Sequence, residues 1–222
     1  MSSTPDFRQD FVAFAIQQDV LRFGEFKTKA GRLSPYFFNA GLFNNGASLR
    51  ALSTFYADAI ESAGVGFDML FGPAYKGIIL AAVAALALAE RGRNVPYAYN
   101  RKEVKDHGEG GTTVGAPIHG RVLIVDDVIS AGTSVRESVE IIHAAGATPA
   151  GVVISLDRQE RGSGTLSASQ EVSQLHGIPV IAVATLHDIV TFLGQNRARS
   201  AEETAKLEKI EAYRRKFGAT QT

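Results

Sequence analysis

Short runs of nearly uninterrupted apolar residues recur along this chain, and they limit its fold more than any other feature. The pattern predicts strands at 68–71, 95–99, 121–125, 151–156 and 180–184. It predicts helices between them at 48–62, 77–90, 133–145 and 168–176. A strand that is apolar at successive positions is buried on both faces, which is typical of parallel sheets. The alternation therefore predicts an α/β fold with a doubly wound, mostly parallel sheet.

Further elements are predicted at both ends of the chain. Residues 6–21 place three phenylalanines at helical spacing and predict an amphipathic first helix. Residues 25–29 and 35–39 lie on either side of a glycine turn, as in a β-hairpin. Residues 200–217 begin with a capping box and predict a last helix. Because no repeat, low-complexity tract or linker divides the sequence, we expect a single domain over residues 1–222.

Charge and composition argue against several classes of protein. The 222 residues include 23 basic and 23 acidic side chains, so the chain as a whole has no attraction to nucleic acid or anionic lipid. The longest apolar run, 78–89, is shorter than the roughly 20 residues of a membrane span. The first residues lack the features of a secretory signal. The absence of cysteine excludes a thiol nucleophile. We therefore expect no nucleic acid and no membrane among its partners.

The segment 121–134 is the most informative in the chain. An apolar strand ends in Asp126 and Asp127, and a loop of small and hydroxyl-bearing residues then leads into a helix. The backbone N–H groups and hydroxyls of such a loop, together with the helix dipole, can hold a phosphate. The two carboxylates cannot bind the same phosphate, so they need a partner with donors or positive charge. Sugar hydroxyls and a hydrated Mg²⁺ meet that need.

Two other interpretations of this segment compete. In the first, Ser134 and Glu137 form only a capping box, and the aspartates lie in a solvated turn. That interpretation does not explain two carboxylates followed by Ser-Ala-Gly-Thr at a strand end. In the second, the pair belongs to a phosphoacceptor receiver domain, with Asp157 as a further acid. Such a domain also needs a lysine at a later strand end, and none lies between 157 and 206.

A polar stretch at 101–115 has four glycines after position 107 and lies between two predicted strands. Loops longer than about 12 residues in a compact domain are usually functional or disordered. In the functional interpretation the glycines act as hinges, and the cations Arg101, Lys102 and Lys105 close over an anion and exclude water. Such cations would stabilise a departing pyrophosphate more in the transition state than in the ground state. His107 can bind the same anion or donate a proton, although a lone histidine in a loop more often faces solvent. A disordered surface loop is the alternative.

Two more places carry residue types that suit a substrate. The turn 72–77 brings Lys76 to a helix start, where free N–H groups and a lysine suit a pyrophosphate. A plain strand-to-helix connection explains its glycines but not the lysine. Phe37 and Phe38 are adjacent, so on a strand only one can enter the core and the other can stack on a planar base. Hydrophobic packing of both rings is the alternative.

Arg158 follows the predicted strand 151–156, which places it at the same sheet edge as Asp126. Its guanidinium can hold a carboxylate in a bidentate pair. A surface salt bridge with Asp157 or Glu160 is the alternative, and from the residues alone it is the favoured one.

Residues 122–134 resemble the phosphoribosyl-pyrophosphate motif of the type I phosphoribosyltransferases. Over nearly its whole length the chain is similar to the bacterial orotate enzymes of that family. The segments that carry this similarity are 34–39, 71–77, 100–111 and 155–162. The acidic motif alone specifies the superfamily, and the other four together point to the orotate branch. The resemblance implies the type I phosphoribosyltransferase fold, with residues 1–45 contributing a small N-terminal hood subdomain.

The resemblance also implies the site residues. Catalytic roles fall to Arg101, Lys105, His107, Asp126 and Asp127. Substrate contacts fall to these five and to Lys29, Phe37, Phe38, Tyr75, Lys76, Lys102, Val128, Ile129, Ser130, Ala131, Gly132, Thr133, Ser134 and Arg158. Among pyrimidines, orotate carries the carboxylate that Arg158 would hold. The bacterial relatives usually have threonine at position 130, and the serine keeps a hydroxyl there.

The implied reaction transfers the 5-phosphoribosyl group from phosphoribosyl pyrophosphate to N1 of orotate. Its products are orotidine 5′-monophosphate and pyrophosphate, in pyrimidine biosynthesis. The implied cofactor is Mg²⁺, held mainly by pyrophosphate, ribose hydroxyls and water near Asp126 and Asp127, with no residue assigned as a direct metal ligand. The resemblance further implies a cytoplasmic homodimer in which Lys102 reaches the neighbouring site.

Two other functions are kept as alternatives. One is a non-catalytic regulator that uses the same fold to sense phosphoribosyl pyrophosphate and bind nucleic acid, which would require a basic face. The other is a transferase for a purine base, in which case Arg158 would have no carboxylate to hold.

Overall fold

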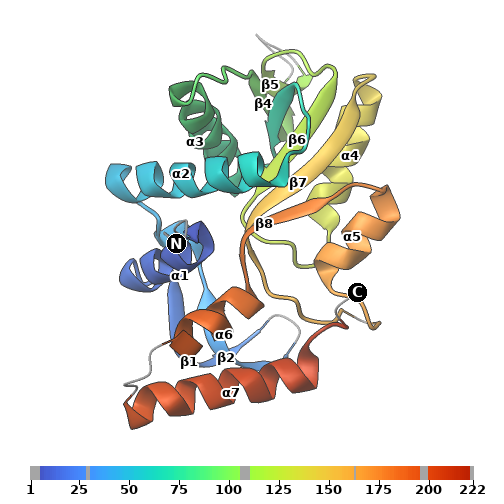
Figure 1. Ribbon diagram of the computed structural model, residues 1–222. Helices are drawn as coiled ribbons and strands as arrows, with labels where there is room; N and C mark the ends of the chain where they lie inside the picture. Colours follow the sequence, from blue (N-terminus) through green and yellow to red (C-terminus); the bar gives the residue numbers. More distant parts are fainter. Residues whose placement is uncertain (1–5, 29–30, 106–110, 163, 196–199, 221–222) are drawn as a thin grey trace.

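A computed structural model describes residues 6–28, 31–105, 111–162, 164–195 and 200–220. Its main sheet has six strands in the order β5-β4-β3-β6-β7-β8 (Figure 1). The parallel strands are β3 (Met69–Gly72), β4 (Tyr97–Lys105), β6 (Arg121–Asp126), β7 (Thr148–Asp157) and β8 (Val180–Thr185). An antiparallel strand, β5 (Gly111–Gly115), lies at the edge beside β4. The predicted α/β fold with a mostly parallel sheet is confirmed.

Helices cover both faces of this sheet. One face packs against α2 (Gly46–Ala63) and α3 (Lys76–Glu90), and the other against α4 (Thr133–Ala144) and α5 (Ala168–His176) (Figure 1). Successive residues of a strand enter different cores: Leu123 lies in the α2–α3 core and Ile124 in the α4 core. Both are fully buried, as expected for central parallel strands. No helix of the described residues is long and apolar enough to span a bilayer.

The chain ends build a second layer beneath the main sheet in Figure 1. It contains α1 (Phe7–Gln17) and the antiparallel pair β1 (Leu21–Lys27) and β2 (Leu33–Phe38), followed by the short 3-10 helix η1 (Ala40–Leu42). It also contains α6 (Leu186–Gln195) and α7 (Ala201–Phe217), and α7 packs against β2. The predicted hairpin and last helix are therefore present, whereas α6 was not predicted. That residues 1–45 act as a separate hood subdomain stays a prediction.

The first helix is shorter than predicted. It ends at Gln17, because Asp19 adopts a positive φ of 55° and Leu21 already begins β1. The last helix begins as the sequence indicates. Ser200 Oγ accepts a hydrogen bond from Glu203 N, and Glu203 Oε2 accepts one from Ser200 N.

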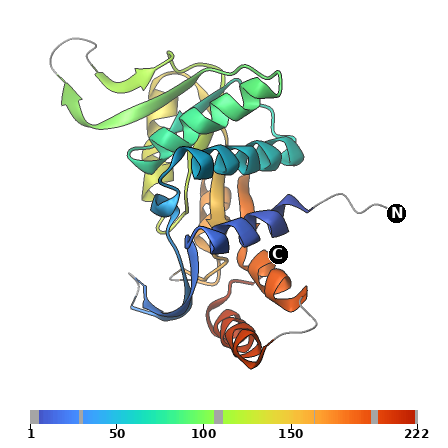
Figure 2. The same cartoon turned by 90° about the vertical axis from the view of Figure 1, so that its left-hand side faces the viewer.

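The prediction of a loop over residues 101–115 was wrong for 101–105 and 111–115, which form strands, and residues 106–110 lie outside the described residues. Strand β4 continues to Lys105 and β5 starts at Gly111. The two strands are antiparallel, with Asn100 opposite Thr113 and Lys105 opposite Gly111, and their register shifts between these two pairs. Figure 2 shows this hairpin as an arm that projects from the edge of the sheet. Pairing satisfies backbone groups that a long loop would leave to solvent, and the β-branched run Thr112 to Val114 favours a strand.

Candidate active site

The acidic pair at the end of β6 is buried and hydrogen-bonded. Asp126 is 8% exposed and Asp127 7%. Asp126 Oδ1 accepts a hydrogen bond from Asp127 N at 2.8 Å, and its Oδ2 accepts one from Ser134 Oγ at 2.9 Å. The interpretation of this pair as a solvated turn is therefore wrong. A capping box of Ser134 with Glu137 is wrong as well, because the N-cap of α4 is Gly132 and no side chain caps this helix.

The loop between the acidic pair and α4 leaves the helix N-terminus without a capping side chain. Gly132 has a positive φ of 70°, which glycine adopts without strain. Residues 128–132 connect β6 to the helix, and Thr133 is its first residue. N–H groups at a helix start that no side chain accepts are suited to bind an anion. The uncapped helix start matches what a phosphate cradle needs, and phosphate binding by this loop stays a prediction.

Two effects raise the pKa of Asp126 to about 6. The larger is burial, which disfavours the charged form, and the second is the neighbouring negative charge of Asp127. Hydrogen bonds from the Asp127 backbone and the Ser134 hydroxyl oppose this rise. At neutral pH Asp126 is therefore ionised, and its charge lowers the free energy of unfolding.

Replacing Asp126 with asparagine should stabilise the protein at pH 7.5. Folding raises the pKa of Asp126 from 3.8 to about 6, so stability falls as the pH rises from 3.8 to 6, and the loss is complete above 6 and absent below 3.8. We expect Asp126→Asn to exceed the wild type by about 2–3 kcal/mol at pH 7.5, with no difference near pH 4. Urea unfolding across this range measures both values. Parallel pH profiles for the two proteins would contradict the prediction.

A residue that the sequence analysis missed holds the end of β6 in place. Tyr56, on α2, is fully buried, and its hydroxyl lies 2.7 Å from both the Asp126 backbone oxygen and Ser155 Oγ. Burial raises the pKa of Tyr56 well above its usual value, so the group remains a phenol that can donate to the carbonyl. The only signal in the sequence was a tyrosine, with its polar hydroxyl, on the apolar face of this helix.

The turn after β3 brings Lys76 to the acidic pair. Lys76 begins α3, and its Nζ forms an ion pair with Asp127 Oδ2. Two glycines permit this close approach. A Cβ atom on Gly72 would lie 2.1 Å from the Gly77 backbone oxygen, and one on Gly77 would lie 2.7 Å from the Val125 oxygen. The predicted role of glycines in shaping this turn is confirmed.

Three of the other predicted substrate residues lie on β4. Arg101 and Lys102 are on β4, and Lys102 Nζ lies 3.5 Å from Glu137 Oε2 on α4. Lys105 is the last residue of β4. Tyr75, the N-cap residue of α3, is 72% exposed. Lys29 and His107 lie outside the described residues.

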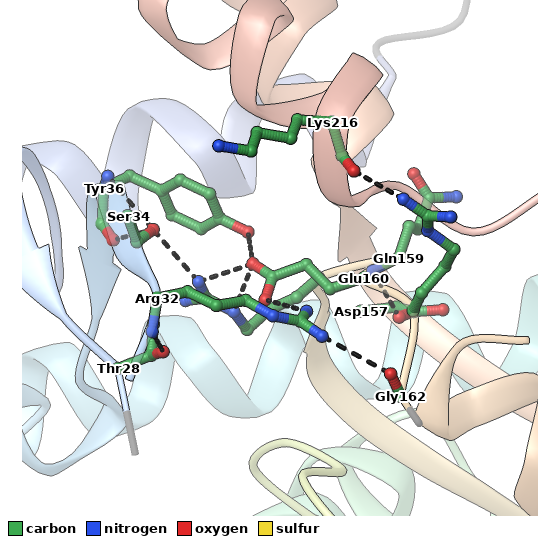
Figure 3. Close-up of polar contacts among 11 residues, drawn as sticks. Thr28, Arg32, Ser34, Tyr36, Asp157, Gln159, Glu160, Gly162 and Lys216 are labelled. Carbon is green, nitrogen blue, oxygen red and sulfur yellow. Dashed lines mark hydrogen bonds and ion pairs between the residues drawn. The ribbon is translucent and has the colours of Figure 1, made fainter. Parts of the chain in front are cut away.

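Arg158 follows β7, and its side chain contacts Ser34 of the small β1–β2 sheet. Figure 3 shows Ser34 and Tyr36 of that sheet beside Glu160. Arg158 Nε and Nη2 donate to Glu160 Oε1 at 2.9 and 2.6 Å, and Nη2 also donates to Ser34 Oγ at 3.1 Å. Its guanidinium carbon lies 4.3 Å from the centre of the Tyr36 ring. The salt bridge with Glu160 is therefore present, whereas Asp157 Oδ1 accepts a hydrogen bond from Gln159 N instead.

The two adjacent phenylalanines of β2 point to different surroundings. Phe37 is 38% exposed and its ring stacks on Phe26, with centroids 5.4 Å apart. Phe38 packs against the core, with its ring 6.4 Å from that of Phe11. The prediction that only one of the pair enters the core is confirmed, and Phe37 offers an exposed aromatic face.

The donor set of the site suits a hard cation that keeps most of its own water. Within the described ranges, no three His, Asp or Glu side chains gather at metal-ligand spacing. Asp126 and Asp127 nevertheless bring two carboxylates to one strand end. Mg²⁺ is commonly held by one or two carboxylates together with substrate phosphates and water, so the pair fits this ion.

Comparisons with known proteins agree on one family. Residues 40–180 match the model of the phosphoribosyl transferase domain. The orotate phosphoribosyltransferase of Chromobacterium violaceum is 68% identical over 213 residues, which is 96% of this chain and 98% of that protein. That of Neisseria meningitidis serogroup C is 64% identical with the same coverage. The crystal structure of the Francisella tularensis orotate phosphoribosyltransferase is 43% identical and covers 95% of this chain and 100% of its own, with a TM-score of 0.85.

Proposed function

Because this chain belongs to the orotate phosphoribosyltransferases of the phosphoribosyl transferase family, we propose that its acidic pair and loop bind phosphoribosyl pyrophosphate and that Arg158 binds orotate. The reaction joins the 5-phosphoribosyl group to orotate and releases pyrophosphate. The identity of more than 60% to curated orotate enzymes over nearly the whole chain carries this conclusion. Pyrimidine biosynthesis is the pathway of these enzymes, and we propose the cytoplasm as the location.

The sugar phosphate occupies the end of β6 in this proposal. The 5′-phosphate accepts hydrogen bonds from the loop 128–134 and the uncapped start of α4. Asp126 and Asp127 accept hydrogen bonds from the ribose hydroxyls. Their negative charge also stabilises the positive charge that develops on the ribose as the bond to pyrophosphate lengthens. Asp126 is held for this task by Ser134 and by the contact of Tyr56 with its backbone.

The leaving pyrophosphate is attended by cations in this proposal. Lys76 is already at the site through its ion pair with Asp127, which opens when an anion competes for the lysine. Arg101 and Lys105 approach from β4, and His107, Tyr75 and Lys29 add contacts. Charge accumulates on pyrophosphate as it leaves, so these groups stabilise the transition state most. No protein nucleophile is needed, since N1 of orotate attacks the sugar.

Mg²⁺ is the proposed cofactor. Asp126 and Asp127 would lie beside it, and when bound it would neutralise part of the pyrophosphate charge. The two carboxylates hold the ribose hydroxyls in place at the same strand end.

A homodimer with shared sites is proposed from the same arrangement. α3 carries exposed apolar side chains at Ile79 and Leu86, seven residues apart and therefore on one face. An exposed apolar face of this kind supports an interface with a second copy of the chain. Lys102 is exposed on the projecting arm, and its ion pair with Glu137 lies at the surface. Such a pair contributes at most about 1 kcal/mol, so Lys102 can leave it to reach the neighbouring site.

Mixed dimers should reveal whether the arm acts across the interface. We expect Lys102→Ala alone to lower turnover at least about tenfold, and the double variant Asp126→Asn/Asp127→Asn to be inactive. If Lys102 serves the partner's site, a dimer of one chain of each kind contains one site with both defects and one intact site. Such dimers, purified through two different tags, should recover about half of the wild-type turnover. Turnover at the mean of the two parent variants would contradict a shared site.

One assay tests the function and separates the alternatives. The protein is mixed with Mg²⁺, phosphoribosyl pyrophosphate and orotate, and the loss of orotate absorbance is followed. Hypoxanthine and adenine then replace orotate. Turnover with orotate alone is expected. Turnover with a purine only, or no turnover at all together with tight RNA or DNA binding, would contradict the proposal.

A further inference from the structure

Arg158 contacts a buried cluster formed by Ser34, Tyr36 and Glu160, and these three residues have no role assigned so far (Figure 3). Glu160 Oε1 accepts hydrogen bonds from Arg158 Nε and Nη2 and a third from Tyr36 Oη at 3.2 Å. The side chains of Arg158 and Glu160 are only 23% and 14% exposed, and Tyr36 is fully buried. Ser34 Oγ accepts the other Nη2 contact and donates to the Tyr36 backbone oxygen at 2.8 Å. The Nε–Nη2 edge of the guanidinium is therefore used within the protein.

The Nη1 group of Arg158 is the donor suited to a ligand. Among the described residues, Arg158 Nη1 has no hydrogen-bond partner, whereas Nε and Nη2 each have at least one. A guanidinium has five N–H donors in a rigid plane, so fixing one edge also fixes the direction of the other. Glu160 thus determines where Nη1 points.

The charges of the cluster leave room for one anion. Arg32 Nη1 lies 3.9 Å from Glu160 Oε2, so two guanidinium groups share one carboxylate. The three side chains carry a net charge of one positive unit. A base with a single carboxylate neutralises that charge, whereas a base without one leaves it uncompensated.

The backbone holds Glu160 in a preset position. Arg161 N donates to the Phe217 oxygen and Ala219 N donates to the Gln159 oxygen, each at 2.8 Å. These bonds fasten residues 159–161 to the end of α7. Because the segment is held on both sides of Glu160, its carboxylate is a fixed support for Arg158 and not a swinging competitor for it.

We propose that Glu160 is a positioning residue for orotate, which fixes the Nε–Nη2 edge of Arg158 and directs Nη1 toward the carboxylate of the base. This inference rests on the proposed role of Arg158. Tyr36 assists by donating its hydroxyl to the same oxygen of Glu160. The role is one of orientation, because Glu160 itself carries the wrong charge to bind orotate.

Two variants of Glu160 separate position from charge. Glu160→Asp keeps the charge but shortens the side chain, so it cannot reach Arg158 in the same way. Glu160→Gln keeps the length and one acceptor oxygen but loses the charge. We expect Glu160→Asp to raise the KM for orotate at least about tenfold, because binding must then order a free guanidinium, and Glu160→Gln to raise it less. The KM for phosphoribosyl pyrophosphate should stay unchanged in both.

Steady-state kinetics with each substrate varied in turn provide the measurement. Glu208→Gln, an exposed glutamate on α7, is the matched control and should behave as the wild type. An orotate KM that is unchanged or lowered in Glu160→Asp overturns the inference, as does an equal rise in both KM values, which would indicate general damage to the fold. If orotate KM responds to Arg158→Ala but not to Glu160→Asp, only this inference fails. If it responds to neither, the proposed role of Arg158 fails.

Discussion

The double variant Asp126→Asn/Asp127→Asn should lose at least about 4 kcal/mol of transition-state stabilisation, or about a thousandfold in turnover. Both amides can still contact ribose hydroxyls, but neither carries the negative charge that stabilises the developing positive charge on the sugar. The loss should therefore fall on kcat more than on the KM for phosphoribosyl pyrophosphate. Initial rates at saturating substrates measure it. Wild-type rates in the folded variant would refute the role of the pair.

The fold should survive this double substitution. The asparagine at 126 can accept from Asp127 N as Oδ1 does now, and its amide can bond to the Ser134 hydroxyl. At 127 the change removes an ion pair with Lys76, whose side chain is 52% exposed, and such pairs contribute about 1 kcal/mol or less. Thermal unfolding should therefore show no loss beyond that amount. Asp68 precedes β3, at the amino ends of the strands and away from the acidic pair. Asp68→Asn is therefore the matched control and should keep full turnover.

The sequence predicted the donor half of the site well, because its chemistry is local. The acids, the loop and the helix start are consecutive residues, so a strand ending in Asp126 fixes where all of them lie. The glycines of the turn 72–77 are equally local in effect. What the sequence did not indicate is Tyr56, which lies 70 residues from its partner Asp126 and meets it only after α2 packs on the sheet.

The part of the site proposed to hold the base was harder to predict, because its contacts join residues that are far apart in the sequence. Ser34 lies 124 residues from its partner Arg158, and Glu160 lies 124 residues from its partner Tyr36. No periodicity in the sequence links these residues. Residue type alone favoured a surface salt bridge for Arg158, and the ion pair with Glu160 exists. The sequence could not show that this pair is largely buried beside two tyrosines, Tyr36 and Tyr213.

The β4–β5 arm illustrates how composition can mislead. Glycine and alternating charge over 101–115 resemble a loop, yet β4 extends to Lys105 and β5 begins at Gly111. An antiparallel pair at the edge of a sheet can expose a face to solvent, so its strands do not need the continuous apolar residues of buried parallel strands. Arg101, Lys102 and Lys105 thereby lie on a strand, although its register with β5 shifts between Asn100 and Lys105. Arg101 is half-buried and Lys102 is exposed, so the two adjacent cations lie in different surroundings.

Arg158→Ala should lower kcat/KM for orotate by more than about a hundredfold. The variant removes the cation for the base carboxylate and also leaves Glu160 buried with Tyr36 and a distant Arg32 as partners. An unpaired buried carboxylate repels the incoming base, and truncating one member of a buried pair typically costs about 2–5 kcal/mol. The KM for phosphoribosyl pyrophosphate is expected to change little, and steady-state kinetics with each substrate varied separately measure both effects.

A double-mutant cycle then tests the physical origin of that loss. If part of it comes from the stranded Glu160 carboxylate, adding Glu160→Gln to Arg158→Ala should recover activity with orotate, although Glu160→Gln alone weakens it. The sign of the second substitution thus reverses with the presence of Arg158, because Glu160 supports the base only through the guanidinium. Equal losses from Glu160→Gln in both backgrounds would mean that the two residues act independently, and would leave their short contact without functional consequence.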